Sequence, residues 1–570
     1  MTFLKNDRDN TVVSSITHSS TSTSFNNKPS MTRCLLSVAI ASSLLLVGCG
    51  DDDNDRVVSD ATSVKPISSF SANQINTQFG LNDTATPLAK CDIKIEKVSY
   101  RTVGAAGERT NATAALMLPS GESADCQGDR PVLLYAHGTT TDKGYDFAQV
   151  GNVKNPAVGE ANLIAANFAA QGYIVVAPNY AGYDESNLDY HPYLVADQQA
   201  TDMADALDSA RKIIERRKSA NDANYSKIDD SGKLFIAGYS QGGHVTMATA
   251  RLLQSQNKPV TAIAPSSGPY ALAAFGDAIF AGNVNIGATR FAPLLAVGLQ
   301  KVDGKLYRNP TEIFTDQYAN TKLPNELSFD ELTSNKVNKL PKNALFQAPP
   351  TGYPDLDALP PSKLPFAPLG FANDGKYLIQ TSYRNEYIMD AIAHPDGVFP
   401  TVTTGLPAEN PENNLRKALK VNDLRSYTPK MPTLLCGGSQ DPTVFYDINT
   451  GSMSAILQQA SAAPDANLNI TVLDVDTRND RGALTPIGSA MSNPWMTTTV
   501  IDNLQDRFSA TLIGVQNKAI ADARAAGVTD PVILEQAAGA AILGSYHGGL
   551  VSASCTEATR EFFEQNFNQL

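Results

Sequence analysis

Residues 233–244 read Lys-Leu-Phe-Ile-Ala-Gly-Tyr-Ser-Gln-Gly-Gly-His, an apolar run that ends in a serine, Ser240, between glycines. The run has the composition of a buried strand, and a helical pattern begins at Gly243, so the serine lies in a turn between strand and helix. A serine in so tight a turn is strained, and a side chain two residues before or after it would collide with neighbouring backbone. Gly238 and Gly242 relieve that crowding and predict a nucleophilic serine, although an ordinary glycine-rich turn is the alternative.

Apolar strands and amphipathic helices alternate around this segment. Two antiparallel strands are expected first, at 94–103 and 112–119, joined by a turn at 104–107. The other candidate elements before residue 266 are strands at 131–138, 173–178 and 260–265 and helices at 162–171 and 195–218. Apolar strands that alternate with helices predict an α/β fold with a mostly parallel sheet covered on both faces.

A chain of 570 residues exceeds one ordinary core, so an insertion or second domain is expected. The alternation stops after residue 270, and residues 271–425 hold 15 of the 33 prolines, with short helical pieces such as 327–337. So long a stretch is unusual for a loop and predicts a mainly helical cap, whose apolar runs at 288–299 and 377–392 would face the site. The core would comprise residues 76–270 and 426–570, with a mostly helical insertion at about 478–540.

The first 48 residues predict an export signal. Residues 1–30 are polar and rich in Ser, Thr and Asn, which predicts disorder, and Met31 could be the true start. A short apolar run follows Arg33 and ends in Leu46-Val-Gly-Cys49. This ending resembles the lipobox of bacterial lipoproteins, which implies an acylated Cys49 and an outer-membrane location; an ordinary signal peptide that happens to contain a cysteine is the alternative. Residues 49–75 are polar and predict a flexible tether.

Composition narrows the possible partners. The net charge of −13, from 45 basic and 58 acidic residues, argues against binding to nucleic acid or to an anionic membrane face. No group of Cys and His residues has the spacing of a zinc site, and no glycine-rich phosphate loop occurs in the sequence. The family resemblance described below implies a small-molecule or lipid ester as the partner, and the N-terminal lipid implies a membrane.

Cysteine usage agrees with export. Apart from Cys49 and a cysteine inside the signal, four cysteines remain, an even number that suits an oxidising compartment. Four cysteines allow three pairings; we favour Cys91–Cys126, which flank one candidate hairpin, and with it Cys436–Cys555. Four buried thiols are the alternative.

Several motifs together resemble the α/β-hydrolase superfamily. In chain order they are His137-Gly-Thr-Thr140, Asn179-Tyr-Ala-Gly-Tyr183, the Ser240 turn, Gly438-Ser-Gln-Asp441 and His547. Over 76–270 and 425–570 the pattern is most similar to microbial secretory lipases and esterases with a large cap after the sixth strand. The resemblance implies an α/β-hydrolase fold and hydrolysis of carboxylic esters through an acyl-serine intermediate, with no metal or organic cofactor.

The resemblance also implies the chain order nucleophile, acid, base, from which a triad can be chosen. A serine hydroxyl needs a base, and that base needs an orienting carboxylate. Of the six histidines only His547 follows both Ser240 and an acid at a strand end. The glycines around it favour a tight loop, and a solvated loop histidine is the alternative. The best-placed acid is Asp441, with Asp474 and Asp476 as fallbacks at the end of the next strand.

An oxyanion at Ser240 would need backbone N–H donors, and the helix after the serine aims its N-terminal N–H groups there. We expect Gln241 and Thr139 to supply them. His137 and His244 are expected to be structural. The loop after the strand at 173–178 contains Tyr183, Asp184 and His191. We expect it to be a surface loop; the alternative is that these three residues line the pocket.

Three functions remain open at this point. An ester hydrolase of the lipase or esterase type, with a feruloyl or tannin esterase as a variant, is favoured by the large apolar cap and the envelope anchor. A serine peptidase on the same fold would need machinery for a peptide terminus, and no propeller repeat is visible. A non-catalytic binding protein is disfavoured because Ser240, Asp441 and His547 are all intact.

Overall fold

The computed structural model describes residues 63–81, 86–463, 466–476, 484–492 and 498–567. The predicted signal, Cys49 and most of the predicted tether lie outside these residues. The described part belongs to one compact unit. None of its helices is both long and apolar enough to span a lipid bilayer.

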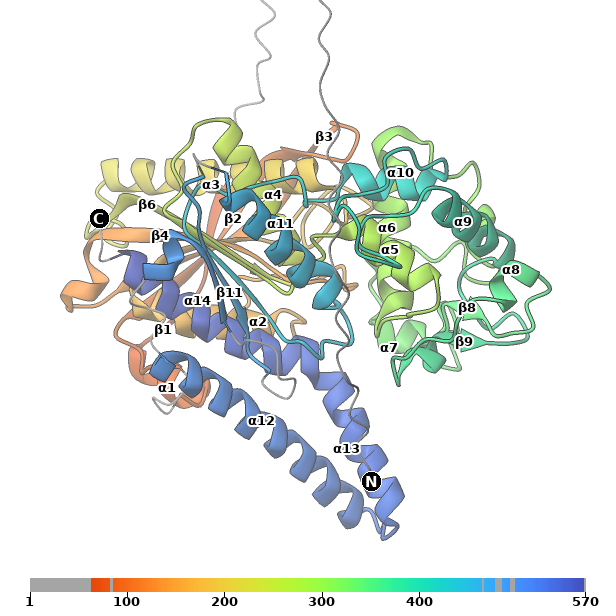
Figure 1. Ribbon diagram of the computed structural model, residues 1–570. Helices are drawn as coiled ribbons and strands as arrows, with labels where there is room; N and C mark the ends of the chain where they lie inside the picture. The colour runs from red at the N-terminus through yellow and green to blue at the C-terminus, as the bar shows by residue number, and fades with distance from the viewer. Residues whose placement is uncertain (1–62, 82–85, 464–465, 477–483, 493–497, 568–570) are drawn as a thin grey trace, which may run out of the picture. The chain divides into compact units, whose positions relative to one another are not determined.

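The centre of this unit is a ten-stranded sheet (Figure 1). In spatial order the strands are β1 (Ser63–Phe70), β2 (Asp92–Val103), β3 (Arg109–Ser120), β5 (Ile174–Pro178), β4 (Gly128–Ala136), β6 (Ile228–Tyr239), β7 (Ala262–Ser266), β10 (Thr433–Gly437), β11 (Asn469–Asp474) and β12 (Leu484–Gly488). In this spatial order, the six strands from β5 to β11 pair in parallel. Strands β1, β2 and β3 at one edge of the sheet and β12 at the other edge pair antiparallel with their neighbours. The predicted fold class, an α/β fold with a mostly parallel sheet, is confirmed.

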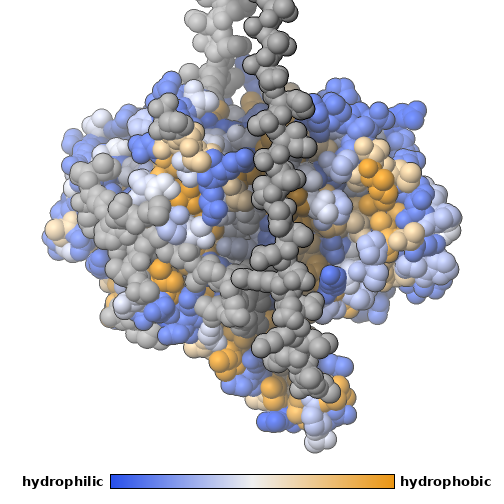
Figure 2. Space-filling view, in the orientation of Figure 1, coloured by the Kyte–Doolittle hydropathy of each residue, from blue (hydrophilic) through white to orange (hydrophobic). Residues whose placement is uncertain are grey.

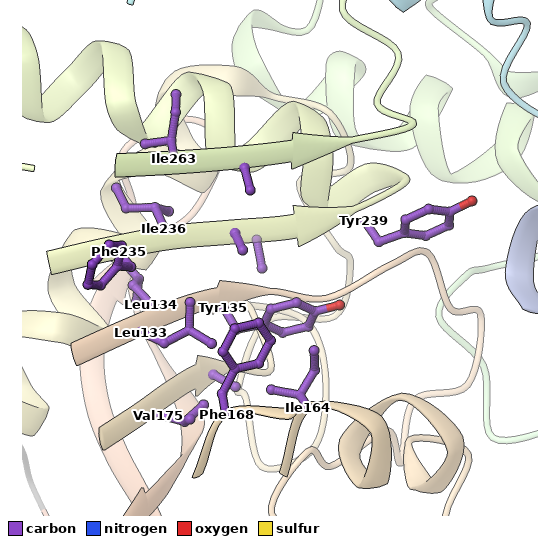
Figure 3. Packing of buried hydrophobic residues seen from close by; sticks show 14 of the residues in the cluster. Leu133, Leu134, Tyr135, Ile164, Phe168, Val175, Phe235, Ile236, Tyr239 and Ile263 are labelled. Atoms are coloured by element: carbon purple, nitrogen blue, oxygen red, sulfur yellow. The ribbon is translucent and has the colours of Figure 1, made fainter. Parts of the chain in front are cut away.

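Helices cover both faces of the sheet, which is why its central strands are apolar throughout. Helices α3 (Ala196–Ser219) and α4 (Gln241–Ser255) lie on one face, and α2 (Val158–Asn167) and α14 (Ser552–Phe567) on the other (Figure 1). The ring of Phe563 in α14 lies 4.7 Å from that of Phe235 in β6 and 6.3 Å from that of Phe168. Figure 3 shows side chains such as Leu133 and Ile263 filling the space beside these strands. This burial supplies most of the favourable free energy of folding.

Strand β1 and helix α1 (Ala72–Gln78) correct the prediction of a flexible tether up to residue 75. Strand β1 pairs antiparallel with β2, and its Ile67 and Phe70 pack against the main core. Helix α1 begins with a capping box, in which Ser71 and Gln74 bond to each other's backbone N–H groups. The polar sequence of β1 concealed it because an edge strand exposes much of its surface.

Residues 271–425, hereafter the cap, leave the sheet after β7 and return at β10. They form α5 (Leu272–Phe280), α6 (Ala288–Asp303), α7 (Phe329–Leu332), α8 (Pro354–Asp357), α9 (Thr381–Ala393), α10 (Asn414–Val421) and a small sheet of β8 (Phe346–Gln347) and β9 (Phe371–Ala372). The cap has an apolar cluster of its own. Its visible surface is hydrophilic with apolar patches (Figure 2).

The helix predicted at 327–337 is wrong in length, because α7 ends at Leu332. The hydroxyl of Thr333 donates to the carbonyl of Phe329 at 2.9 Å, and that of Ser334 donates to the carbonyl of Glu331 at 2.7 Å. Such side-chain bonds to the backbone compete with continuation of a helix.

The second insertion, predicted as mostly helical over about 478–540, also contains a strand. Its helices are α12 (Thr498–Ala525) and α13 (Pro531–Ser545), but β12 pairs antiparallel with β11 and extends the sheet. Strand β12 contains Pro486, which argues against a central strand and suits the sheet edge.

Two disulfides are present, in the favoured pairing. Cys91 is joined to Cys126 and Cys436 to Cys555. The second bond links β10 directly to α14 across 119 residues of sequence. It therefore holds together the two elements beside which Asp441 and His547 lie.

Candidate active site

Ser240 lies in the turn between β6 and α4, with a φ of 59° and a ψ of −120°. A non-glycine residue in so rare a conformation costs about 1–3 kcal/mol. The Ser240 N–H donates to the carbonyl of Ser266 at 3.0 Å, which holds the turn. A Cβ at Gly238 would lie 2.3 Å from the carbonyl oxygen of Gly242, and one at Gly242 would lie 1.9 Å from that of Ala136. Both glycines are required by close backbone approach, as the sequence predicts.

Asp441 and His547 meet beside this turn. Nδ1 of His547 lies 2.6 Å from Oδ2 of Asp441, and it carries the proton because a carboxylate only accepts. Oδ1 of Asp441 accepts from the backbone N–H groups of Thr443 and Val444, at 2.8 and 3.1 Å. Nε2 of His547 is buried without a hydrogen-bond partner among the described residues. Its lone pair is therefore not engaged by any other group in the described part of the chain.

The backbone around His547 differs from the predicted tight loop. Residues Tyr546–Val551 form a π-helical turn between α13 and α14. A Cβ at Gly544 or Gly548 would meet no atom within 4 Å, so crowding does not explain these glycines. The Tyr239 hydroxyl donates to the carbonyl of His547 at 2.6 Å and fixes the turn against the end of β6.

The two fallback acids have other hydrogen-bond partners. Oδ1 of Asp474 accepts from the N–H groups of Ser439 and Asp476, at 3.0 and 2.9 Å. Oδ2 of Asp476 accepts from the Tyr546 hydroxyl at 2.5 Å. Asp474 thus shapes the loop that leads to Asp441, and Asp476 holds the residue next to the histidine.

The other histidines near the turn are buried and neutral. Burial lowers the pKa of His191 to about 3 and that of His244 to about 4, and it also lowers the pKa of His137. His137 stacks on Tyr180 with ring centroids 4.2 Å apart. Nε2 of His244 lies 2.9 Å from the carbonyl oxygen of Asn422. His137 and His244 are packed structural residues, as the sequence predicts.

The loop that contains His191 is not the surface loop that was expected. Tyr183 and His191 are both buried, and their ring centroids lie 4.6 Å apart. Nε2 of His191 lies 2.7 Å from Nε2 of the Gln241 side chain, next to the serine. Asp184 instead forms a salt bridge with Lys97 at 2.8 Å. This loop therefore packs behind the serine turn, a role that no periodicity in the sequence could indicate.

Thr139 and Gln241, the expected oxyanion donors, each line a cavity together with Ser240. Gln241 is the first residue of α4, and Thr139 follows β4. Neither N–H group donates to another residue within the described part of the chain. Oε1 of Glu160 accepts from the N–H of Gly138 at 3.0 Å and so holds the loop that contains Thr139. Sequence reasoning missed Glu160, because an acid in a helix carries no signal of this role.

Two cavities meet at Ser240. The first, of about 430 Å³, is lined by Ser240, Thr139 and His547. The second, of about 100 Å³ and hereafter the cap cavity, is lined by Ser240, Gln241 and mainly apolar residues of α5, α6 and α10. Helix α6 thus faces the serine, as expected of the run at 288–299. From the run at 377–392 only Ile379 lines the cap cavity.

A wider groove of about 1210 Å³ lies between the cap and α13. Its walls include Asp441 and Phe445 but neither Ser240 nor His547. Ser240 and His547 together line the cavity of about 430 Å³ instead.

No family model matches this sequence, and no curated protein matches it. Solved structures do match. A ligand-bound form of the rice cell wall degrading esterase LipA from Xanthomonas oryzae is 25% identical, with a TM-score of 0.55 over 74% of this chain and 93% of the esterase. Another LipA crystal structure is 24% identical, with a TM-score of 0.55 over 79% and 97%. Candida antarctica lipase A is 13% identical, with a TM-score of 0.41 over 72% and 75%. The LipA matches show that this chain has the α/β-hydrolase fold of an esterase.

We expect Asp441→Asn to slow the labelling of Ser240 by an alkyl fluorophosphonate by about 10⁴-fold, because an asparagine sets the wrong imidazole tautomer. Labelling is followed by mass spectrometry of the intact protein. Asp474→Asn is the matched control and should keep most of the labelling rate. Rapid labelling of Asp441→Asn together with loss in the control would move the acid to Asp474.

Proposed function

We propose that this protein hydrolyses carboxylic esters through an acyl-serine intermediate. The observation that carries the proposal is the strained Ser240 in one cavity with His547, whose Nδ1 is bonded to Asp441. The likeness to an esterase over 93% of that protein's length supports the same chemistry.

The proposed steps use side chains and backbone groups of this chain. Nε2 of His547 accepts the proton of the Ser240 hydroxyl while Oγ attacks the ester carbonyl. The N–H groups of Gln241 and Thr139 donate to the oxyanion, and each such donor contributes about 3–4 kcal/mol in comparable enzymes. His547 then returns the proton to the departing alcohol, and a water molecule activated by the same nitrogen hydrolyses the acyl-serine.

The two cavities at Ser240 suggest where each half of the ester binds. The leaving alcohol must approach His547, which protonates it, so the cavity of about 430 Å³ suits the alcohol. The cap cavity includes Ser240 and Gln241 but not His547, and it suits the acyl chain. Its walls come from α5, α6 and α10, so the cap would set the acyl preference.

Ser240→Ala should abolish hydrolysis of 4-nitrophenyl acetate, butyrate and octanoate and leave the unfolding temperature close to that of the wild type. The reason is that the other hydroxyl between Gly238 and Gly242, that of Tyr239, donates to the carbonyl of His547 and cannot replace the serine. Amino-acid 4-nitroanilides assayed beside the esters separate an esterase from a serine peptidase. Cleavage of anilides without cleavage of esters would favour the peptidase.

Ala292→Phe should shorten the preferred acyl chain, because Ala292 lines the cap cavity from α6. One methylene in an apolar pocket is worth about 1–3 kcal/mol, so kcat/KM for the octanoate should fall about tenfold or more while that for the acetate changes little. The matched control is Val302→Phe, an exposed position on the same helix. An equal chain-length profile in both variants would mean that the acyl chain binds elsewhere.

We also propose that the protein is exported and anchored by a lipid at Cys49. Membrane fractionation of bacterial cells that express the protein tests this proposal. The two disulfides support an oxidising compartment, and the segment ending at Cys49 resembles a lipobox. Cys49→Ser should move the protein from the membrane to the soluble fraction or leave the signal uncleaved. Unchanged membrane association of the processed variant would contradict lipidation.

A further inference from the structure

A wide apolar groove adjoins the cavity of about 430 Å³ at Ser240, hereafter the serine cavity. The groove has a volume of about 1210 Å³, and its walls come from the cap, from the loop after β10 and from α13. Most of its lining residues are apolar, among them Leu364, Phe366, Ile392 and Leu543. Ile392 is 62% exposed, so a large aliphatic side chain is left in contact with solvent. An apolar surface of this extent indicates a binding site.

The groove and the serine cavity share a wall at α13. Leu543 lines both of them. Gly539 and Ile542, earlier in the same helix, line the groove but not the serine cavity, whereas His547, just after the helix, lines the serine cavity. Residues four positions apart lie on one face of a helix, so Gly539 and Leu543 mark a path along α13 from the groove toward His547.

One apolar cluster contributes to the walls of the groove and of both cavities at Ser240. In this cluster Phe366 and Phe445 line the groove, Phe275 lines the cap cavity, and Leu543 packs against the three rings. The ring centroids of Phe275 and Phe445 lie 5.2 Å apart. A carbon chain that passes Leu543 on the way to the groove therefore meets apolar side chains rather than charged ones.

The charged residues of the groove favour no ionic ligand. Asp277 forms a salt bridge with Arg416 at 2.7 Å, and Asp441 is the acid already bonded to the histidine. The other two charged residues that line the groove are Lys363 and Asp447, which have opposite signs. The groove thus offers neither an excess of positive charge for an anion nor an excess of negative charge for a cation, and it suits an uncharged apolar ligand.

We propose that the groove binds a long alkyl chain on the alcohol half of the ester. The proposal rests on the proposed ester hydrolysis, in which the leaving alcohol must approach His547. The serine cavity has only about a third of the volume of the groove, about 430 Å³ against 1210 Å³, so a long alcohol extends past Leu543 into the groove. Each methylene that the groove removes from water strengthens binding about three- to fourfold. The substrate class is therefore esters of long-chain alcohols, and a methyl or ethyl ester leaves the groove unused.

The test measures kcat/KM for butyl, octyl and dodecyl acetate, each below its solubility limit, by gas chromatography of the released alcohol. All three esters have the same small acetyl group, so only the alcohol half changes. We expect kcat/KM of the wild-type protein to rise at least about tenfold from butyl to dodecyl acetate. Methyl tridecanoate, an isomer of dodecyl acetate with the long chain on the acyl side, controls for the apolar character of the whole ester.

Gly539→Trp tests the groove directly. A Cβ at Gly539 would meet no atom within 4 Å, so an indole at this position enters the groove without a clash at the helix. The variant should lower the ratio of kcat/KM for dodecyl acetate to that for methyl tridecanoate at least about fivefold. Gly514→Trp in α12 is the matched control, because a Cβ at Gly514 also meets no atom within 4 Å and this residue does not line the groove. It should leave the isomer ratio unchanged.

Ile392→Asp is a second variant in case Gly539→Trp does not fold, which fluorophosphonate labelling of Ser240 reports. It places a charge in the same groove and should also lower the isomer ratio. Three results overturn the inference: a wild-type kcat/KM that does not rise with alcohol length, an isomer ratio that neither groove variant lowers, or an equal fall of that ratio in Gly514→Trp. Absence of hydrolysis for all four esters and for 4-nitrophenyl acetate would instead reject the proposed function.

Discussion

The strained turn at Ser240 is the constraint on which the rest of the site depends. A Cβ at Gly242 would lie 1.9 Å from the carbonyl oxygen of Ala136, so the first turn of α4 approaches the end of β4 without any intervening side chain. The same approach brings the start of α4 beside the loop that follows β4. Gln241 lies at the start of α4, and Thr139 lies in that loop. The requirement for glycine and the candidate oxyanion donors are therefore two results of one packing arrangement.

The proposed base, His547, and the proposed acid, Asp441, reach this turn from distant parts of the chain, and several contacts join them to it. The Cys436–Cys555 disulfide links β10, which precedes Asp441, to α14, which follows His547. The hydroxyl of Tyr239, adjacent to the serine, donates to the carbonyl of His547 at 2.6 Å. Catalytic groups must be held within fractions of an ångström, and a site assembled from distant elements needs such direct ties.

The sequence predicted the features that rest on local pattern or chain order and missed those that rest on long-range pairing. The glycines around Ser240, the order of Asp441 and His547, and the helix at 195–218 all follow from such patterns. Strands β1 and β12 were missed because each lies at a sheet edge, where strand composition is weakly constrained. Glu160 was missed because its role depends on which backbone N–H group the fold brings to it. The hydrogen bond between His191 and Gln241 joins residues 50 positions apart. A sequence shows neither the orientation of a side-chain amide nor the tautomer of a histidine ring.

Buried ion pairs join separate segments of the cap to one another. Arg416 in α10 bonds Asp277 in α5 at 2.7 Å, and Arg425 bonds Asp396 at 2.7 Å and Asp423 at 2.8 Å, all of them buried. A buried ion is costly unless all its bonds are made, and the bonds between Arg416 and Asp277 form only when the first and last helices of the cap lie side by side. Helices α5 and α10, which the Arg416–Asp277 pair joins, also line the cap cavity. The Arg416–Asp277 pair therefore holds together two helices that form walls of the apolar cavity.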